Sequence, residues 1–313
     1  MGVKWQDAGY DGSFEEKKAM PVSTGTSEVI KNFGLEKYLL ELEVDGLTVV
    51  PPQVHGVSLQ VIDQMVGLLL NYAESMTGSP FSLDEGPGKR LHFPQPPNGL
   101  TAAAEEPGQF LIQQLAHKNR LFRDLAVNPV AVGLMGCLVG HKAVRFSSHN
   151  SFIKWQGDYG YGPSLGMHAD QTAQPLPWGR TALTANTNWC LTEYSNEGGC
   201  LAYVPGSHRF GTPAQFPQAV RQAVPVEASK GSMIVFHGAT WHGAFPRKTP
   251  GLRLSIANYY RHQAVTSQED FSGSFPNELA EDCDDAERFK ELCGFSDIFP
   301  YQKQSEKVPT VLG

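Results

Sequence analysis

Short β-rich runs alternate with clusters of Gly and Pro in the second half of the chain, and this alternation constrains the fold more than any other feature. The runs cover residues 143–154, 181–192, 200–204, 232–236 and 253–260. Short strands separated by turn formers at this spacing are typical of a β-sandwich or a β-barrel. The sequence therefore predicts a mainly β core with flanking helices, with residues 141–262 forming the core.

The first half of the chain has the apolar spacing of helices. We expect helices over residues 35–42, 58–72, 108–125 and 129–138, the last with Asn128 as N-cap and Pro129 at the first helical position. A brief strand is predicted after Asp45, and an irregular loop over the Pro-rich and Gly-rich residues 77–100. Residues 31–140 would then form a mostly helical buttress.

The chain ends are polar. Residues 1–30 have little to bury and are expected to form a flexible N-terminal segment, whereas residues 263–313 form a C-terminal extension with one helix over 285–293. Residues 31–313 are thus predicted to be a single domain.

Composition excludes several classes of protein. The net charge is −7 and the basic residues are scattered, which argues against a nucleic-acid partner. Five cysteines without a C-x-x-C pair indicate buried free thiols. The apolar run at residues 65–70 is too short to cross a bilayer and no signal peptide is visible, so we expect a cytoplasmic protein without a membrane partner. The oligomeric state stays open.

His168 and Asp170 stand two residues apart, so on an extended segment both side chains project to the same side. A third ligand is needed, and His242, which follows the apolar run at 232–236, is the strongest candidate. Two histidines and one carboxylate suit Fe(II) with three open positions. His237 is an odd number of residues from His242 and should point away, and His208 follows a turn and is interpreted as a structural group.

Turn formers at residues 245–251 separate His242 from a further strand that begins near Arg253. This pattern predicts a hairpin in which His242 and Arg253 face each other. A guanidinium in that place could grip a carboxylate with two hydrogen bonds. Taken alone, Arg253 is better explained as an ordinary surface arginine of a sheet.

Four segments taken in order resemble the phytanoyl-CoA dioxygenase family of Fe(II)/2-oxoglutarate-dependent oxygenases. They are HAD at 168–170, GGCLAYVPGSH at 198–208, GSMIVFHGATWHGAF at 231–245, and Arg253. The similarity spans roughly residues 45–260. It implies a double-stranded β-helix (jelly-roll) core in which His168, Asp170 and His242 bind Fe(II) and Arg253 holds the distal carboxylate of 2-oxoglutarate.

The resemblance also places two further residues near 2-oxoglutarate. Trp189 matches a family position beside this co-substrate, and Lys154, at the end of the strand that enters the site, is a weaker candidate of the same kind. A buried core tryptophan and a solvent-facing lysine are the alternatives. Members of the family often carry a polar side chain where this chain has Ala244, so the second contact to the carboxylate is open.

The function implied by the resemblance is hydroxylation of an unactivated C–H bond of a small organic molecule, with 2-oxoglutarate and O₂ converted to succinate and CO₂. Asp170 favours this outcome over halogenation, for which relatives carry a small residue in its place. Desaturation or rearrangement on the same scaffold is an alternative, as is a non-catalytic jelly-roll protein that binds a metal or acts as a sensor.

Aromatic residues gather around the loop that precedes the metal pair. Trp155, Tyr159, Tyr161 and Trp178 could line a pocket for an apolar or ring-bearing substrate, or simply anchor the loop. Without a dense cluster of Lys and Arg for a coenzyme A diphosphate, a free small molecule is preferred to an acyl-CoA.

Overall fold

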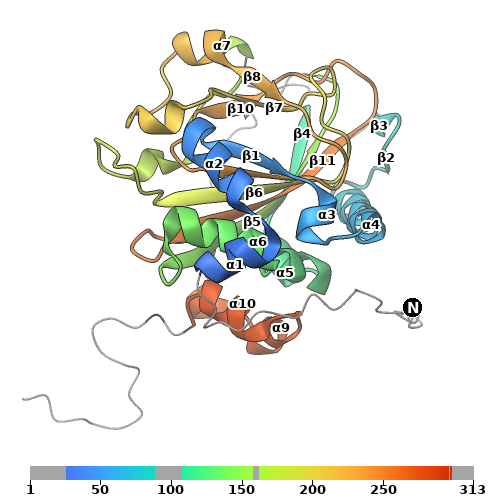
Figure 1. The fold of residues 1–313 in the computed structure, drawn as a ribbon. Coiled ribbons are helices and arrows are strands. Elements are labelled where there is room, and N and C mark those ends of the chain that lie inside the picture. Colours follow the sequence, from blue (N-terminus) through green and yellow to red (C-terminus); the bar gives the residue numbers. More distant parts are fainter. Residues whose placement is uncertain (1–25, 89–107, 158–161, 296, 298–313) are drawn as a thin grey trace, which may run out of the picture.

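A large antiparallel sheet lies between a layer of helices and a smaller sheet in the computed structural model, which describes residues 26–88, 108–157, 162–295 and 297 (Figure 1). The large sheet has the strand order β1-β9-β6-β11-β5-β4, and the smaller one has the order β10-β7-β8. Two facing antiparallel sheets of this kind form the jelly-roll core that the sequence predicted.

The strands are short, apart from two long ones at the centre of the large sheet. Their bounds are β1 Leu47–Val50, β2 Phe81–Ser82, β3 Gly86–Pro87, β4 Gln109–Ile112, β5 Val144–Lys154, β6 Thr184–Cys190, β7 Leu201–Tyr203, β8 Val224–Val226, β9 Met233–His237, β10 His242–Ala244 and β11 Arg253–His262.

Most helices pack on one face of the large sheet, and the remainder lie in connections and in the C-terminal part (Figure 1). The α-helices are α1 Thr26–Phe33, α2 Glu36–Asp45, α3 Pro52–His55, α4 Leu59–Thr77, α5 Arg120–Ala126, α6 Pro129–Met135, α7 Gln218–Gln222, α8 Phe271–Ser274, α9 Asn277–Glu281 and α10 Ala286–Leu292. The short 3₁₀ turns are η1 Leu115–His117, η3 Gly162–Ser164, η4 Asp170–Ala173 and η5 Ser207–Arg209, and η2 Gly136–Gly140 is a π-helical turn.

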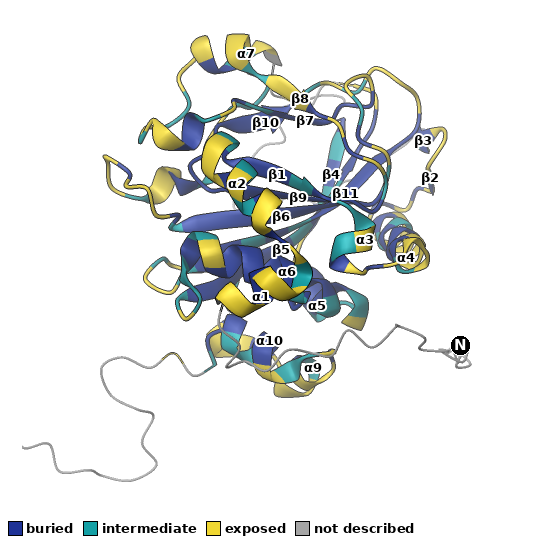
Figure 2. Cartoon of the chain, in the orientation of Figure 1, coloured by how far each residue is buried: buried dark blue, intermediate teal, exposed yellow. Residues whose placement is uncertain are grey.

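Alternation along β5, β6 and β11 separates two environments. In β11, residues 254, 256 and 260 face the helices, whereas residues 253, 255, 257 and 259 face the smaller sheet. The pairing of β11 with β5 shifts by one residue between Tyr259 and Tyr260, so Phe146 faces the helices although Ser148 faces the smaller sheet. Most strands of this sheet are buried, whereas the edge strand β4 alternates buried and half-buried residues (Figure 2).

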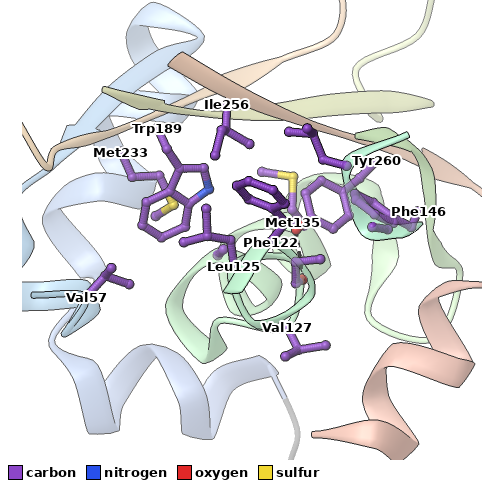
Figure 3. Packing of buried hydrophobic residues seen from close by; sticks show 14 of the residues in the cluster. Val57, Phe122, Leu125, Val127, Met135, Phe146, Trp189, Met233, Ile256 and Tyr260 are labelled. Carbon is purple, nitrogen blue, oxygen red and sulfur yellow. Dashed lines mark hydrogen bonds between the residues drawn. The ribbon is translucent and has the colours of Figure 1, made fainter. Parts of the chain in front are cut away.

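The main apolar core lies between the large sheet and the helices. Trp189, Ile256 and Tyr260 from the sheet pack against Phe122 and Leu125 of α5 (Figure 3). Tyr260 also donates a hydrogen bond from its hydroxyl to the carbonyl of Ala126 at 2.9 Å. This core leaves the other face of the sheet available to polar side chains.

Most predicted elements are present, with one clear error among the helices. Asn128 caps α6 by accepting hydrogen bonds from the N–H groups of Val130 and Ala131. The predicted helix over 108–125 is wrong, because Gln109–Ile112 forms the edge strand β4 and a helix begins only at Arg120. Phe110 and Ile112 alternate with half-buried neighbours, which is the pattern of a strand.

Two predictions fall partly outside the described residues. Residues 1–25 of the expected N-terminal segment are outside them, whereas α1 begins within that segment at Thr26 and buries Val29 and Ile30. The irregular loop over 77–100 is described as far as residue 88, and there it contains the paired strands β2 and β3.

In the described part of the chain, no single helix has the length and hydropathy needed to cross a membrane, although α5 together with residues 129–140 forms a bent pair that passes by length and composition. The five cysteines are all described and are free thiols, of which Cys137 is exposed and the other four are buried.

Candidate functional site

Three side chains from separate segments converge between the two sheets. His168 and Asp170 come from the segment before β6, and His242 begins β10. One ligand atom from each of them can be chosen so that all three atoms lie within 4.8 Å of one another. We call these three residues the triad. The structure therefore brings together the residues that the sequence singled out as metal ligands.

Backbone pairing fixes the position of the two histidines. The N–H of His168 donates to the carbonyl of His242, and the N–H of His242 donates to the carbonyl of His168, both at 2.8 Å. Gly243 makes this approach possible, because a Cβ atom there would lie 2.3 Å from the carbonyl oxygen of Leu165. A side chain at this position would push apart the two segments that carry the histidines.

Hydrogen bonds to the backbone also orient both imidazole rings. Nδ1 of His168 lies 2.7 Å from the carbonyl of Gly166, and Nδ1 of His242 lies 3.0 Å from the carbonyl of Thr240. A carbonyl can only accept, so Nδ1 carries the proton in each ring. In the neutral ring Nε2 has a free lone pair, and it lies 3.4 Å from an Asp170 oxygen in His168 and 3.7 Å in His242.

Asp170 is held from two sides. Nδ2 of Asn186 donates to Oδ2 of Asp170 at 2.5 Å, and the hydroxyl of Tyr259 donates to the Asp170 carbonyl at 3.2 Å. Asn186 lies on β6 and Tyr259 opposite it on β11. The large sheet therefore positions a carboxylate that belongs to a different segment.

The charges of the triad suit a cation. Burial lowers the pKa of His242 to about 4, so this ring is neutral. Burial opposes ionisation of Asp170, but His242 and His168 outweigh it and lower the pKa of the carboxyl. Burial likewise lowers the pKa of His168, yet the hydrogen bond and charge of Asp170 raise it overall. A proton on His168 and a bound divalent cation would each place a positive charge beside the Asp170 carboxylate. Protons therefore compete with the cation for this site.

The donor set fits Fe(II). Two neutral imidazole nitrogens and one carboxylate oxygen, all directed toward one point, are the ligands of a facial triad that leaves three positions open for other groups. The hydrogen bonds from Nδ1 to backbone carbonyls are the outer contacts that metal-bound histidines ordinarily make. His168, Asp170 and His242 could therefore hold this metal.

The triad lines a cavity of about 320 Å³ between the sheets. Arg253 and Lys154 lie at its closed end, and each is only 3% exposed. The opposite end is open, because the His168 side chain is 55% exposed. A small molecule would reach the triad from the side of His168.

Arg253 lies at the end of the cavity away from the solvent. Its guanidinium donates to the carbonyl of Gly199 and stacks over the ring of Tyr194 at 4.6 Å. Its Nε has no hydrogen-bond partner among the described residues. A buried cationic group with an unused donor is suited to a carboxylate ligand.

The predicted hairpin between His242 and Arg253 is wrong. His242 pairs with Tyr203 of β7 in the smaller sheet, whereas Arg253 pairs with Lys154 of β5 in the large sheet. The connection over residues 245–252 crosses from one sheet to the other. His242 and Arg253 therefore approach the same cavity from opposite sheets instead of across one ladder.

Lys154 is buried, not solvent-facing. It lies directly opposite Arg253 across the pairing of β5 with β11 and lines the cavity. Burial, and then the charge of Arg253, lower the pKa of Lys154 well below its usual value. A negatively charged ligand would stabilise the ammonium form of this residue.

Trp189 does not lie beside the cavity, which corrects its predicted role. It occupies an odd position of β6, whereas Asn186 and Asn188 at even positions line the cavity. Its ring faces α5 and α6 (Figure 3) and packs edge-on against His55 with ring centroids 4.8 Å apart. Trp189 is part of the apolar core.

The remaining histidines and aromatic residues that the sequence offered as candidates are either part of the packing or lie outside the described residues. His208 and His237 face each other at a ring distance of 5.4 Å, away from the triad. Trp155 packs against Phe81, and Trp178 lies in a buried cluster with Trp241. Tyr159 and Tyr161 lie outside the described residues, and Ala244 lines the cavity as expected from its position.

The polar residues of the cavity wall were not predicted from the sequence. Ser148, Asn150, Asn186 and Asn188 all line it from the large sheet. Their signal was a concentration of polar residues in segments that the sequence predicts to be core strands, in SSHNSFIK and TANTNWC. Polar residues in a strand of the core indicate that one face of the strand borders a polar enclosed space.

Comparison with known proteins gives one family. The model of the phytanoyl-CoA dioxygenase family (PhyH) matches residues 45–255. Dioxygenase af480 of Aspergillus fumigatus is 30% identical over 195 residues, which cover 61% of this chain and 60% of that protein. The matched region thus spans less than two thirds of this relative.

Solved structures share the fold at low sequence identity. HygX from Streptomyces hygroscopicus with nickel and 2-oxoglutarate bound has a TM-score of 0.53 at 14% identity, covering 74% of this chain and 88% of that one. The epimerase SnoN in complex with Fe³⁺, α-ketoglutarate and nogalamycin RO has a TM-score of 0.51 at 18% identity, covering 73% and 84%. These similarities concern the fold alone.

Proposed function

This chain belongs to the phytanoyl-CoA dioxygenase family, and on that premise we propose that it hydroxylates an unactivated C–H bond of a small organic molecule. Fe(II), 2-oxoglutarate and O₂ are the cofactor and co-substrates of such a dioxygenase. The observation that carries the proposal is the convergence of His168, Asp170 and His242 in a cavity whose closed end is cationic.

The proposed role of the triad is to hold Fe(II). Its rings are oriented by the backbone before any metal arrives, and Asn186 holds one carboxylate oxygen of Asp170. Ligands that are already in place lose little freedom on binding and bind more tightly. With metal and 2-oxoglutarate bound, the centre supplies an oxidant that removes hydrogen from a C–H bond as 2-oxoglutarate becomes succinate and CO₂.

Arg253 and Lys154 are proposed to bind the distal carboxylate of 2-oxoglutarate. Arg253 directs its guanidinium into the closed end, and Lys154 adds a second positive charge there when it is protonated. Both side chains are almost completely buried, which strengthens their electrostatic contacts with a ligand. The ring of Tyr194 beneath Arg253 keeps the guanidinium plane fixed.

Anaerobic addition of Fe(II) and 2-oxoglutarate tests the proposal directly. We expect a weak visible charge-transfer band from the chelate in the wild-type protein, and its loss in His168→Ala and Asp170→Ala. His141→Ala, just after η2 and remote from the triad, is the matched control and should keep the band. A wild-type protein without the band, or triad variants that retain it, would rule out the proposed site.

A further inference from the structure

The walls of the cavity differ in character across the large sheet. On the β6 side, Arg253 leans over Tyr194 and toward Gly199, and Asn186 holds Asp170. On the opposite side of β11 lie Ser148, Asn150 and Phe152 of β5, together with Gln268 from the segment after β11. We call these last four residues the β5 wall.

The β5 wall lies beside the path of 2-oxoglutarate. A co-substrate held between the triad and Arg253 would place its distal carboxylate beside Arg253 and Lys154, at the end of β5. Asn150 lies four residues before Lys154 on β5, about 13 Å along the strand at ordinary rise, and Ser148 lies farther still. This part of the β5 wall is therefore left for a second molecule that reaches the triad.

Hydrogen bonding within the β5 wall leaves one acceptor unused. Ser148 donates from its hydroxyl to Oε1 of Gln268 at 2.5 Å, and Nδ2 of Asn150 donates to the Ser148 hydroxyl at 3.4 Å. Oδ1 of Asn150 is buried and has no hydrogen-bond partner among the described residues. A buried carbonyl oxygen without a donor is costly, and a bound hydroxyl or N–H group removes that cost.

Apolar groups complete this half of the cavity. Phe152 belongs to the β5 wall, and Ala257 lies opposite Asn150 on β11. An apolar surface with one directed polar group is typical of sites that orient a small organic molecule.

We infer that the substrate presents an uncharged hydrogen-bond donor, a hydroxyl or an amide N–H on an apolar carbon skeleton, to Oδ1 of Asn150. This inference rests on the proposed function and names the chemical class of its substrate. Contact with the β5 wall would hold the skeleton beside the triad and so determine which C–H bond is oxidised.

Charged substrates are disfavoured by the same residues. The β5 wall carries no ionic side chain, so a carboxylate would be desolvated without a cation and would face the Asn150 oxygen. An ammonium group could donate to this oxygen, but the β5 wall offers no carboxylate to balance its charge. A neutral donor avoids both costs.

Matched probes that differ only in the polar group test the inference. Cyclohexylmethanol, cyclohexanecarboxamide, cyclohexanecarboxylic acid and cyclohexylmethylamine, with their cyclopentyl and phenyl counterparts, are titrated into the anaerobic complex with Fe(II) and 2-oxoglutarate. The readout is the shift of the charge-transfer band as a probe binds near the metal. We expect the alcohol and the amide to bind at least about tenfold more tightly than the acid and the amine.

Variants of the β5 wall test whether these residues cause the preference for the alcohol and the amide. Asn150→Leu should weaken alcohol and amide binding by about five- to tenfold, the loss of one hydrogen bond. Gln268→Leu, in an exposed segment, should weaken them less and is a second test if Asn150→Leu folds poorly. Asn277→Leu makes the same Asn-to-Leu change on the exposed helix α9 and is the control.

The outcomes separate this inference from the proposed function. A wild-type band that responds best to the acid or the amine, or to none of the probes, overturns the inference and leaves the iron and 2-oxoglutarate site intact. Equal probe affinities in the wild type and in both β5-wall variants also overturn it. Absence of the band itself overturns the proposed function.

Discussion

Lys154 and Arg253 lie directly opposite each other on β5 and β11, and both are buried at the closed end of the cavity. Like charges that face each other across a ladder destabilise a sheet. The cost falls when a dianion binds between them or when Lys154 gives up its proton. Two buried cations in this arrangement are therefore better explained by a ligand than by the stability of the fold.

Arg253→Ala should weaken 2-oxoglutarate binding roughly 10- to 100-fold, because it removes a charge-assisted contact. Iron binding should be unchanged, since Arg253 is on the opposite sheet from His242. Anaerobic titration of the charge-transfer band measures the first affinity, and metal competition measures the second. Arg221→Ala on α7 is the control. An unchanged 2-oxoglutarate affinity would remove the assignment.

Lys154→Met should make the ligand-free protein as stable as the wild type or more stable, because the variant no longer buries an ionisable group beside Arg253. The stabilisation that 2-oxoglutarate gives should at the same time become smaller. Thermal unfolding with and without 2-oxoglutarate measures both effects. If the ligand stabilises the wild type and the variant equally, Lys154 does not contribute to its binding.

Asn186→Ala should lower the affinity for Fe(II) about 10- to 100-fold, as expected when an outer contact to a metal-binding carboxylate is lost. Competition with a chelator measures this affinity, and circular dichroism checks the fold. Asn196→Ala changes an exposed asparagine and is the control. Equal iron affinity in Asn186→Ala and the wild type would show that the hydrogen bond from Asn186 to Asp170 does not contribute to iron binding.

Trp189→Ala should reduce the free energy of unfolding by about 3–5 kcal/mol, the usual cost of a large cavity in a core. Trp189→Phe should cost less. In Trp189→Phe the affinity for 2-oxoglutarate should equal that of the wild type, because the ring lies on the helical side of the sheet (Figure 3). Urea unfolding and band titration test the two statements, and a clear loss of 2-oxoglutarate affinity would contradict the second.

Glu269 predicts a pH effect on stability. Burial raises the pKa of its carboxyl from 4.5 to about 6, and one carboxyl oxygen accepts from the His149 N–H at 2.9 Å. The folded chain therefore binds more protons than the unfolded chain in this window. The contribution of Glu269 to stability is complete below pH 4.5 and is lost as the pH rises through about 6.

Glu269→Gln keeps the acceptor and removes the ionisation. The variant should be more stable than the wild type at pH 7 by about 1 kcal/mol, a value reduced for the partial exposure of the group, and equally stable at pH 4. Urea unfolding at both pH values measures the difference. Glu74→Gln on the exposed face of α4 is the control. A constant difference at the two pH values would contradict this account.

Local patterns predicted the fold well where one signal dominated. The apolar run of β9 and the Asn128 cap of α6 were recognisable because each depends on neighbouring residues. The order of the strands in the sheet could not be recognised from the sequence, since β1 pairs with β9 across almost 200 positions of the chain. Such pairing depends on packing between distant segments, which periodicity does not record.

The site was predicted to a similar extent. His168 and Asp170 share a side because they are two apart, but their approach to His242 depends on a bridge between distant backbones. The face occupied by Trp189 could have been inferred from the polar residues Asn186 and Asn188, which alternate with it along β6. The sheet to which Arg253 belongs could not have been inferred from the sequence, because the same turn-forming residues occur in a hairpin and in a connection that crosses between sheets.

The paired hydrogen bonds between the backbones of His168 and His242 have a mechanical consequence. Any rearrangement that moves the two backbones apart must break both bonds, whereas a motion that displaces them together breaks neither. The histidines are thus coupled as one rigid unit. Motion of the two segments as a unit therefore leaves the spacing of the two histidine backbones unchanged.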